Sequence, residues 1–534
     1  MSGTNEAEPS AVLGRGSAVL GIELGSTRIK AVLVGAGDTP IAAGSSAWES
    51  SYVDGSWTYG LDEVWAGVQA AVSAVLDDAQ ARWGVRPASF AGVGVSGMMH
   101  GYLAFDANGE LLVPFRTWRN SSAAPAAREL SALLGVNIPE RWSIAHLVQA
   151  VLDAEPHAGS LDFVTTLAGY VHWRLTGRRV LGVGDASGMF PLDPVTHEYD
   201  AQRCAVVEEL LAEHGAPLRI RELFPQPLVA GAEAGALTAE GVLLLDPTGA
   251  IVAGARMCPP EGDAGTGMVA TGAVRPRTGN VSVGTSIFAM IVLERPLSQV
   301  HDEVDLVATP SGDDVAMVHC NNGASELGVW AGVMGEAAAA LGAPTDPDAV
   351  FAALLGAALE GEADAGGVLS FSLLAGEPIL GLGDGRPMVV RSPGSRMTLA
   401  NFMRSQVYGI FTTLHVGMRV LAAEGVGVDV MQAHGGVFRT PGVAQRFCAA
   451  AVGAPVAVAQ TAGEGGAWGM AVLASYALRG AGRTLADYLD AEVFVGRADP
   501  VVSPQDEDVE GFRRSVAGFE SGLAAVRAAV ESLR

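Results

Sequence analysis

A chain of 534 residues is too long for one ordinary hydrophobic core, so we expect two large domains. Hydrophobic residues make up 49% of the sequence and charged residues 17%, which is enough apolar material to fill such cores. The formal net charge of -25 argues against nucleic acid and anionic lipid as partners, because like charges repel.

The sequence carries no signal for secretion or for membrane insertion. Residues 1–16 are small and polar, without the basic start and apolar core of a secretory signal, and we expect residues 1–17 to be a flexible tail. No run of about 18 uncharged apolar residues suggests a membrane span, so we predict a cytoplasmic protein with no membrane partner. The four cysteines lack metal-site spacing and are expected to be buried, reduced thiols.

The first half of the chain begins with a predicted β-hairpin. Two β-rich runs, residues 18–24 and 29–34, flank the turn Gly25-Ser26-Thr27. Apolar residues at helical spacing then predict a helix over 61–76. A strand over 92–96 ends in the turn Gly97-Met-Met-His-Gly101, and residues 106–109 predict the turn of a second hairpin.

The second half repeats this opening. A strand over 279–283, the turn Gly284-Thr285-Ser286 and a strand over 287–293 form another predicted hairpin. The further expected elements are a strand near Val456 and helices over 399–424, 442–452, 468–478 and 512–533. One hairpin in each half suggests a duplicated domain with a cleft between the halves.

The two Gly-hydroxyl turns are candidate phosphate sites. Glycine permits close backbone approach, and the hydroxyls of Ser26, Thr27, Thr285 and Ser286 can donate to phosphate oxygens. Such turns are also common in ordinary hairpins. Two of them, each after an apolar strand and in different halves, could grip a polyphosphate from both sides.

Asp263 is the candidate general base. It lies among glycines in Glu261-Gly262-Asp263-Ala264-Gly265, where a carboxylate could meet a substrate hydroxyl. The alternative is an aspartate that caps a helix start. Both can hold, since a catalytic aspartate can lie at a helix N-terminus.

Other polar residues follow predicted strands. Met99 and His100 lie on a strand-end loop, where α/β folds place ligands, although a lone histidine is more often structural. Trp118 and Asn120 could line a sugar pocket or end a surface hairpin. The loops at 434–436 and 463–466 could admit an adenosine beside the backbone or simply begin helices.

Taken in order, these segments resemble the FGGY carbohydrate kinase family, and most closely its xylulokinases and related pentulose kinases. The resemblance covers about residues 18 to 490, and the matching segments are short. They are Gly21–Lys30, Val95–Gly101, Phe115–Asn120, Tyr170–Gly177, Asp185–Asp193, Gly262-Asp263, Gly284–Ser286, His434–Gly436 and Gly469–Ala474.

The resemblance implies an α/β fold of two actin-like ATPase (ribonuclease H-like) domains with an interdomain catalytic cleft. The sugar-binding domain would span 18–275, the nucleotide-binding domain 276–500, and a terminal helical segment 501–534. That last helix would pack on the second domain or on a partner subunit, which leaves a homodimer open.

The resemblance also implies an ATP- and Mg²⁺-dependent phosphorylation of a ketose, most directly xylulose. Asp263 would be the base and a substrate contact, and Glu23 would bind Mg²⁺ directly or through water. The expected sugar contacts are Met99, His100, Trp118 and Asn120. The expected nucleotide contacts are Gly25, Ser26, Thr27, Gly284, Thr285, Ser286, Gly435 and Gly436.

The chain departs from the family pattern at several positions. Glu23 stands where aspartate is usual, Met98 replaces a glutamine, and Asn120 replaces an aspartate. An arginine common just beyond is absent. Kinases for ribulose, L-xylulose, gluconate or glycerol therefore stay open, as does an actin-like ATP-binding module without sugar kinase activity.

Overall fold

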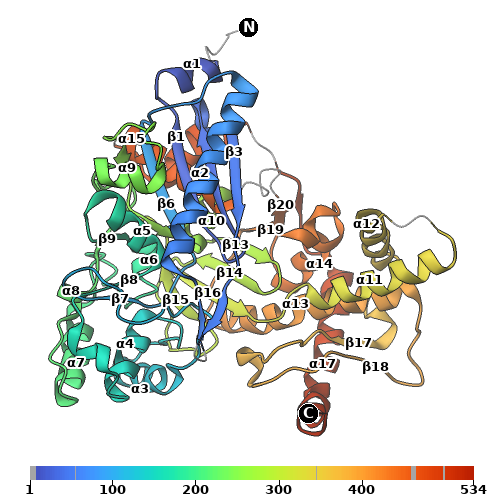
Figure 1. Ribbon diagram of the computed structural model, residues 1–534. Coiled ribbons are helices and arrows are strands. Elements are labelled where there is room, and N and C mark those ends of the chain that lie inside the picture. The colour runs from blue at the N-terminus through green and yellow to red at the C-terminus, as the bar shows by residue number, and fades with distance from the viewer. Residues whose placement is uncertain are drawn as a thin grey trace. The chain divides into compact units, whose positions relative to one another are not determined.

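The computed structural model describes residues 8–53, 56–343, 346–458, 465–480, 482–496 and 499–533. These residues form two compact α/β units (Figure 1). Unit 1 contains the described residues within 1–275, 306–315 and 464–497, and unit 2 those within 276–305, 316–463 and 498–534. The chain thus crosses between the units several times, which differs from a single division after residue 275.

The core of unit 1 is a mixed six-stranded sheet. Its strands are β1 (Val19–Leu24), β2 (Arg28–Val34), β3 (Pro40–Ala47), β6 (Gly92–Gly97), β11 (Arg256–Met257) and β12 (Glu261–Gly262). The order in space is β11-β6-β1-β2-β3, and β12 also pairs with β6. The first hairpin, β1–β2, is antiparallel as predicted, and β1 pairs with β6 in parallel.

Three helices of unit 1 pack on this sheet or on one another. α2 (Leu61–Trp83) packs along β2 and β3, while α15 (Gly465–Arg479) packs on β1, β2, β6 and α10 (Asp263–Thr271) (Figure 1). Gly469 permits this last contact, since a Cβ there would lie 2.1 Å from the carbonyl oxygen of Thr266. The predicted helix over 468–478 therefore exists but belongs to unit 1.

The remainder of unit 1 is mostly helical. It contains α3 (Ala124–Leu134), α4 (Ser143–Leu152), α5 (Leu167–Thr176), α6 (Val183–Ala186), α7 (Ala201–Glu213), α8 (Ile220–Leu223) and α9 (Ala239–Leu245). The hairpin-like turn predicted at 106–109 is confirmed, since Gly109 N donates to Asp106 O (3.0 Å), Leu112 N donates to Ala104 O (2.9 Å) and Phe105 forms an antiparallel bridge with Leu111. The sequence did not predict a second partner for the first strand of this hairpin. β7 (Leu103–Phe105) pairs with the distant β8 (Phe163–Thr165), because this buries Phe105 against Phe163.

Unit 2 is built on a seven-stranded sheet. Its strands are β13 (Thr278–Val283), β14 (Ile287–Val292), β15 (Asp305–Ala308), β16 (Asp314–Cys320), β19 (Val430–His434), β20 (Val456–Val458) and β21 (Val501–Val502). Their order is β15-β16-β14-β13-β19-β20-β21. The hairpin β13–β14 is antiparallel and β13 pairs with β19 in parallel, so unit 2 repeats the arrangement of β1, β2 and β6.

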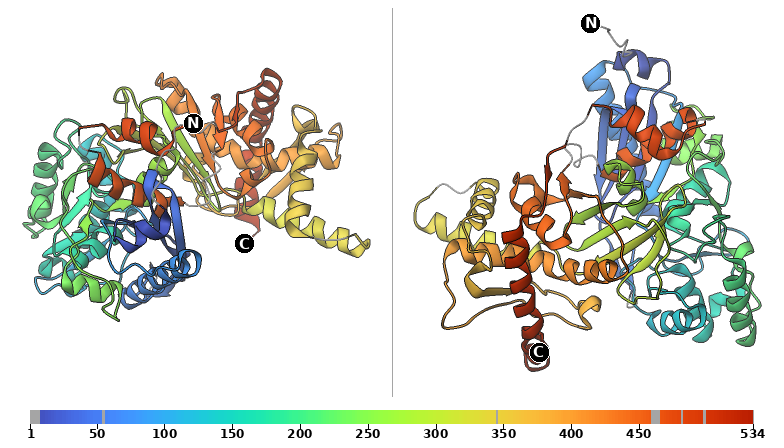
Figure 2. Two further views of the ribbon diagram at one scale, coloured as in Figure 1. Left: turned by 90° about the horizontal axis from the view of Figure 1, so that it is seen from above. Right: turned by 180° about the vertical axis from the view of Figure 1, so that it is seen from behind.

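Long helices complete unit 2: α11 (Ser325–Ala340), α12 (Pro347–Ala358), α13 (Leu399–Ala423), α14 (Val443–Val452) and α17 (Asp506–Ser532). Figure 2 shows α17 in dark red, and it packs against α14, α13 and β17 (Val368–Phe371) of the same unit. Its Asp508 is fully buried and accepts hydrogen bonds from Arg404 and Arg446. The terminal helix therefore packs on the second domain, one of the two predicted outcomes.

The N-terminal segment is more ordered than predicted. Residues 1–7 lie outside the described part, but Pro9–Gly14 form the short helix α1. Its Val12 and Leu13 are buried in the core of unit 1, which explains why this part of the expected flexible tail is fixed. Among the described residues, no helix has both the length and the apolar character needed to cross a bilayer.

Candidate active site

The turn between β1 and β2 presents its hydroxyls to solvent. Ser26 and Thr27 are exposed, and the hairpin is closed by a hydrogen bond from Gly25 N to Arg28 O (3.0 Å). Glu23 lies at the end of β1, opposite Lys30 on β2. The Lys30 ammonium lies 3.5 Å from the Glu23 carboxylate, so a charged pair flanks the turn.

Asp263 is the first residue of α10 and directly follows β12. Gly262 is the N-cap residue of this helix, so Asp263 lies at its N-terminus, as the sequence suggested. Its Oδ1 accepts a hydrogen bond from the backbone N–H of Met99 (3.1 Å). The parallel pairing of β12 with β6 brings the two segments together, because Met99 follows the end of β6.

The loop after β6 is held from several sides. His100 has a φ of 70°, a left-handed conformation that costs energy for a non-glycine residue. Its ring hydrogen-bonds through Nδ1 to the Gly188 carbonyl oxygen (3.2 Å). The ring also stacks on that of Trp142, with the ring centroids 6.3 Å apart. Strained residues cluster at functional sites, so this loop is a credible ligand contact.

Two further carboxyls, those of Glu261 and Asp185, lie near Asp263, and the sequence analysis assigned a role to neither. Glu261, on β12, accepts hydrogen bonds from the backbone N–H groups of Gly184 (3.3 Å) and Asp185 (2.9 Å). Asp185 accepts one from the Thr166 hydroxyl (2.6 Å). Both residues lie inside the quoted segments, but nothing in their spacing indicated that they would meet.

Burial disfavours ionisation throughout this carboxyl cluster. It raises the pKa of Asp263 to about 6, with the Met99 N–H acting against this and the Glu23 charge adding to it. Burial and the Asp263 charge likewise raise the pKa of Asp185 to about 7, against the hydrogen bond from Thr166. Burial and the charge of Asp185 raise the pKa of Glu261 to about 8. Strongly shifted carboxyls at a strand-end loop are typical of functional sites.

The start of α15 reaches the same place. A Cβ at Gly466 would lie 2.5 Å from Glu23 Oε1 and 2.8 Å from the Thr266 hydroxyl, so only glycine leaves room for the carboxylate. Residues 463 and 464 of the predicted 463–466 loop lie outside the described residues. The site in unit 1 thus combines β1, the β6 loop, α10 and α15.

The remaining sugar-side candidates are less well placed to meet a ligand. Asn120 is buried, with its amide donating to the Ser56 hydroxyl (2.9 Å) and its oxygen accepting from Ser122 N (2.9 Å). Its side chain is therefore already engaged on both ends. Trp118 is partly buried against the core of unit 1.

The second turn and the 434–436 loop lie together in unit 2. Gly284 and Thr285 are exposed. Gly435 has a φ of 122° and lies so close to β13 that a Cβ would be 2.0 Å from the Val283 carbonyl oxygen. The structure therefore brings Gly435 beside the strand that leads into the Gly284–Ser286 turn.

A magnesium ion at this site would take most of its ligands from phosphate and water. Across the described ranges, no group of three or more His, Cys, Asp or Glu residues is arranged to hold a metal. Mg²⁺ commonly uses one or two carboxylates and takes its other ligands from phosphates and water. The carboxylate oxygens of Glu23, beside the exposed turn, fit such a minimal site.

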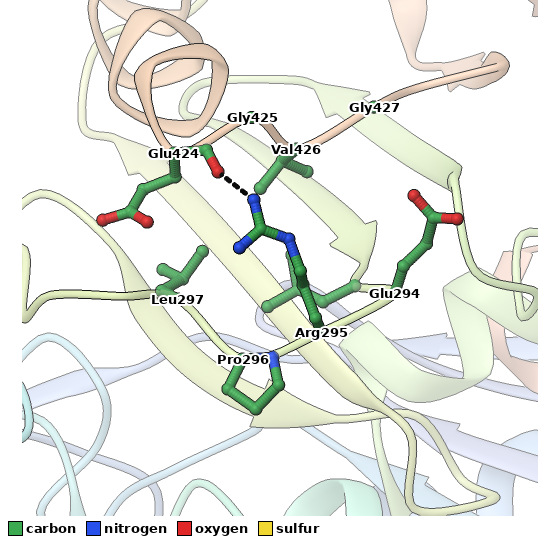
Figure 3. A pocket seen from close by; sticks show the side chains of 9 residues that line it. Glu294, Arg295, Pro296, Leu297, Glu424, Gly425, Val426 and Gly427 are labelled. Atoms are coloured by element: carbon green, nitrogen blue, oxygen red, sulfur yellow. Dashed lines mark hydrogen bonds between the residues drawn. The ribbon is translucent and has the colours of Figure 1, made fainter.

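A hollow at the end of β14 has no comparable chemistry. Arg295 fills it and donates to the Glu424 carbonyl oxygen at 2.8 Å (Figure 3). The Glu424 carboxylate is bound by His301 (2.7 Å) and by Ser298 N, which lowers its pKa to about 2. These groups satisfy one another, so the hollow is structural.

Comparison with known proteins identifies two family domains. Sequence models of the FGGY family of carbohydrate kinases match residues 18–212 (N-terminal domain) and 279–478 (C-terminal domain). Glycerol kinase 1 of Pseudomonas aeruginosa is 29% identical over 234 residues, 41% of this chain and 44% of that protein. The chain therefore matches less than half of the length of this curated relative.

Solved structures match almost the whole chain. A ligand-bound xylulose kinase from Lactobacillus acidophilus has a TM-score of 0.77 at 18% identity, covering 95% of this chain and 99% of that one. A gluconate kinase from the same organism has a TM-score of 0.76 at 18% identity, and the match covers 95% of this chain and 98% of that one. A Plasmodium falciparum glycerol kinase with ADP has a TM-score of 0.72 at 13% identity, and the match covers 96% of this chain and 98% of that one. These matches confirm the predicted fold class of two actin-like α/β domains, while the cleft between them stays a prediction.

Proposed function

Since this chain belongs to the FGGY family of carbohydrate kinases, we propose that it transfers the γ-phosphoryl group of ATP to a ketose hydroxyl, with xylulose as the first acceptor to test. Matches to proteins named for xylulose, gluconate and glycerol support a sugar or polyol acceptor. They do not select one, so ribulose, L-xylulose, gluconate and glycerol remain in the test set. We place the reaction in the cytoplasm, where ATP is supplied.

One observation carries this proposal: the hydrogen bond between Met99 N and Asp263 Oδ1 (3.1 Å). It joins the candidate sugar loop to the candidate base, although 164 residues separate them in the chain. A nucleotide-binding module alone has no need of a carboxylate held against such a loop. This contact supports the proposal that Asp263 is the base that meets a bound hydroxyl.

In the proposed mechanism, Asp263 accepts the proton of the attacking sugar hydroxyl as the oxygen forms its bond to the γ-phosphorus and the bond to the β-phosphate oxygen breaks. The hydrogen bond from Met99 N to Oδ1 would hold the carboxylate in place for this step. A pKa near 6 leaves the carboxyl mostly ionised at neutral pH and still basic enough to take a proton. Met99 and His100 would fix the ketose, with Trp118 lining the pocket.

Phosphate binding is assigned to the two turns. Ser26 and Thr27 would hold the γ-phosphate through hydroxyl and backbone donors, and Gly284, Thr285 and Ser286 would hold the remaining phosphates, with adenosine along Gly435-Gly436. Mg²⁺, when bound, would neutralise charge on the phosphates. Glu23 would hold it directly or through water, with Lys30 keeping the carboxylate in place.

The test is an acceptor panel with direct product detection. Purified protein is incubated with Mg-ATP and, separately, xylulose, ribulose, L-xylulose, gluconate or glycerol, and both ADP and the phosphorylated product are quantified. We expect ADP release that depends on one acceptor. ATP loss that is the same with every acceptor and without any would reject the kinase proposal and favour an actin-like ATP-binding module.

A variant pair tests the role of Asp263. Asp263→Asn should lower kcat by about 10²–10⁴-fold, with nucleotide binding little changed. The matched control is Asp246→Asn, which changes a carboxylate that binds backbone N–H groups of a turn elsewhere in unit 1. Near-normal turnover of Asp263→Asn would show that the base is another residue.

A further inference from the structure

The turn between β1 and β2 lies against a pair of aromatic side chains. Trp48 follows β3, and Tyr59 follows the short strand β5 (Ser56–Thr58). Their rings stack with centroids 4.2 Å apart and an interplanar angle of 28°. Trp48 is 8% exposed and Tyr59 4%, so their polar atoms need partners within the protein.

Those partners are the backbone carbonyls of the turn. Trp48 Nε1 donates to Gly25 O and the Tyr59 hydroxyl donates to Ser26 O, each at 2.7 Å. The backbone N–H of Trp48 donates to Thr27 O at 3.2 Å. The two residues therefore hold all three carbonyl oxygens of the Gly25–Thr27 turn.

Fixing these carbonyls also fixes the opposite donors. In a trans peptide unit the N–H points away from the preceding C=O, and the described backbone contains no cis bond. The N–H groups of Ser26 and Thr27 must therefore point away from the aromatic pair. Neither donates to a protein acceptor within the part of the chain that the structure describes, and both residues are exposed.

The turn of unit 2 shows the same constraint met by different atoms. The carbonyl oxygen of Gly284 accepts from Ala324 N (2.8 Å), and that of Thr285 accepts from Gly323 N (2.7 Å). The first two carbonyls of both turns are thus held from behind. Of these two turns, side chains donate to the first two carbonyls in unit 1, whereas backbone N–H groups do so in unit 2. The orientation of the unit 1 turn can therefore be tested by side-chain substitution.

We propose that Trp48 and Tyr59 are positioning residues that aim the N–H groups of Ser26 and Thr27 at the γ-phosphate of ATP. The inference rests on the proposed function, which assigns the γ-phosphate to this turn. The aromatic pair donates to the carbonyl side of the turn and would act without touching the nucleotide. It sets the direction of the donors before ATP binds, so less ordering is required on binding.

The test compares two nucleotides that differ in the γ-phosphate. Calorimetry gives the Kd of Mg-AMP-PNP and of Mg-ADP for the wild type, Trp48→Phe and Tyr59→Phe, which lose one side-chain donor each and keep an aromatic ring. Trp83→Phe and Tyr476→Phe are matched controls, because they remove an indole donor to Ile41 O (2.7 Å) and a phenol donor to Arg483 O (2.8 Å) in the same unit. Melting temperatures are measured for all five proteins.

We expect Trp48→Phe and Tyr59→Phe to weaken Mg-AMP-PNP about fivefold to tenfold, the scale of one hydrogen bond, while Mg-ADP binding stays within the range of the controls. Their melting temperatures should match those of the corresponding controls. Equal weakening of both nucleotides, or none, would overturn the proposal even if the acceptor panel finds a sugar. Loss confined to AMP-PNP would support it even if no tested sugar is phosphorylated.

Discussion

The pH dependence of phosphoryl transfer tests the assigned base most directly. A base must be ionised, and burial holds the pKa of Asp263 at about 6, above the ordinary aspartate value. Such a group is about half ionised at pH 6 and about a tenth ionised at pH 5. The rate that depends on Asp263 should therefore be flat above about pH 7 and fall about tenfold between pH 7 and pH 5.

The assay must separate Asp263 from the titration of ATP itself. Rates are measured at saturating Mg-ATP by direct quantification of the sugar phosphate, so that no coupling enzyme contributes its own pH profile. The residual rate of Asp263→Asn, measured alongside, reports every titration except that of residue 263. The ratio of wild type to variant then isolates the base.

The outcome can contradict the reasoning in two ways. A ratio that is constant from pH 3 to pH 8 would show that Asp263 does not act as a base. A fall centred near pH 4 would show a carboxyl with an ordinary pKa, exposed rather than buried in the active enzyme. Asp185→Asn should leave the fall near pH 6, because burial and the Asp263 charge raise the pKa of Asp185 to about 7 and this carboxyl is already mostly uncharged where Asp263 titrates.

Two further predictions concern the surroundings of the site, and one concerns the buried ion pair of unit 2. Gly466→Ala should lower kcat by tenfold or more in steady-state assays, because its Cβ would lie 2.5 Å from Glu23 Oε1; unchanged kcat would mean that Glu23 need not stay in place. Asp508→Ala should destabilise unit 2 by about 3–5 kcal/mol in urea titrations, because it leaves Arg404 buried without its partner. Burial raises the pKa values of Asp185 and Glu261 to about 7 and about 8. The stability that their protonated forms contribute to the fold is therefore complete below about pH 4, the ordinary carboxyl pKa, and is lost as the pH rises through about 7 and 8. The melting temperature of the wild type should fall over this window, and that of Asp185→Asn should fall less.

Local pattern was enough to predict the two hairpins and the long helices. The runs on either side of Gly25-Ser26-Thr27 are apolar and β-rich, and the turn between them is short, so neighbouring residues determine the pairing. The residues over 399–424 likewise keep a helical period long enough to be unambiguous, and α13 spans Leu399–Ala423.

The contacts that build the site could not be predicted from the sequence, because they depend on pairing between segments far apart in the chain. β12 is only two residues long, too short to show any period, yet its pairing with β6 is what brings Asp263 to Met99. Glu261 meets Asp185 only after the intervening helices have packed, at a separation of 76 residues. α1 was missed because a few apolar residues beside polar ones give no periodic signal, although Val12 and Leu13 are buried.

The duplicated hairpins share a backbone plan but carry different chemistry. In unit 1 the second strand pair from the turn is Glu23 opposite Lys30, whereas the equivalent pair in unit 2 is Ser282 opposite Phe288. Within unit 1, the charge of Glu23 also raises the pKa of Asp263 in part. A turn flanked by neutral residues can bind phosphates through backbone donors but cannot place a metal or move a proton. This asymmetry supports assigning proton transfer and the γ-phosphate to unit 1 and the rest of the nucleotide to unit 2.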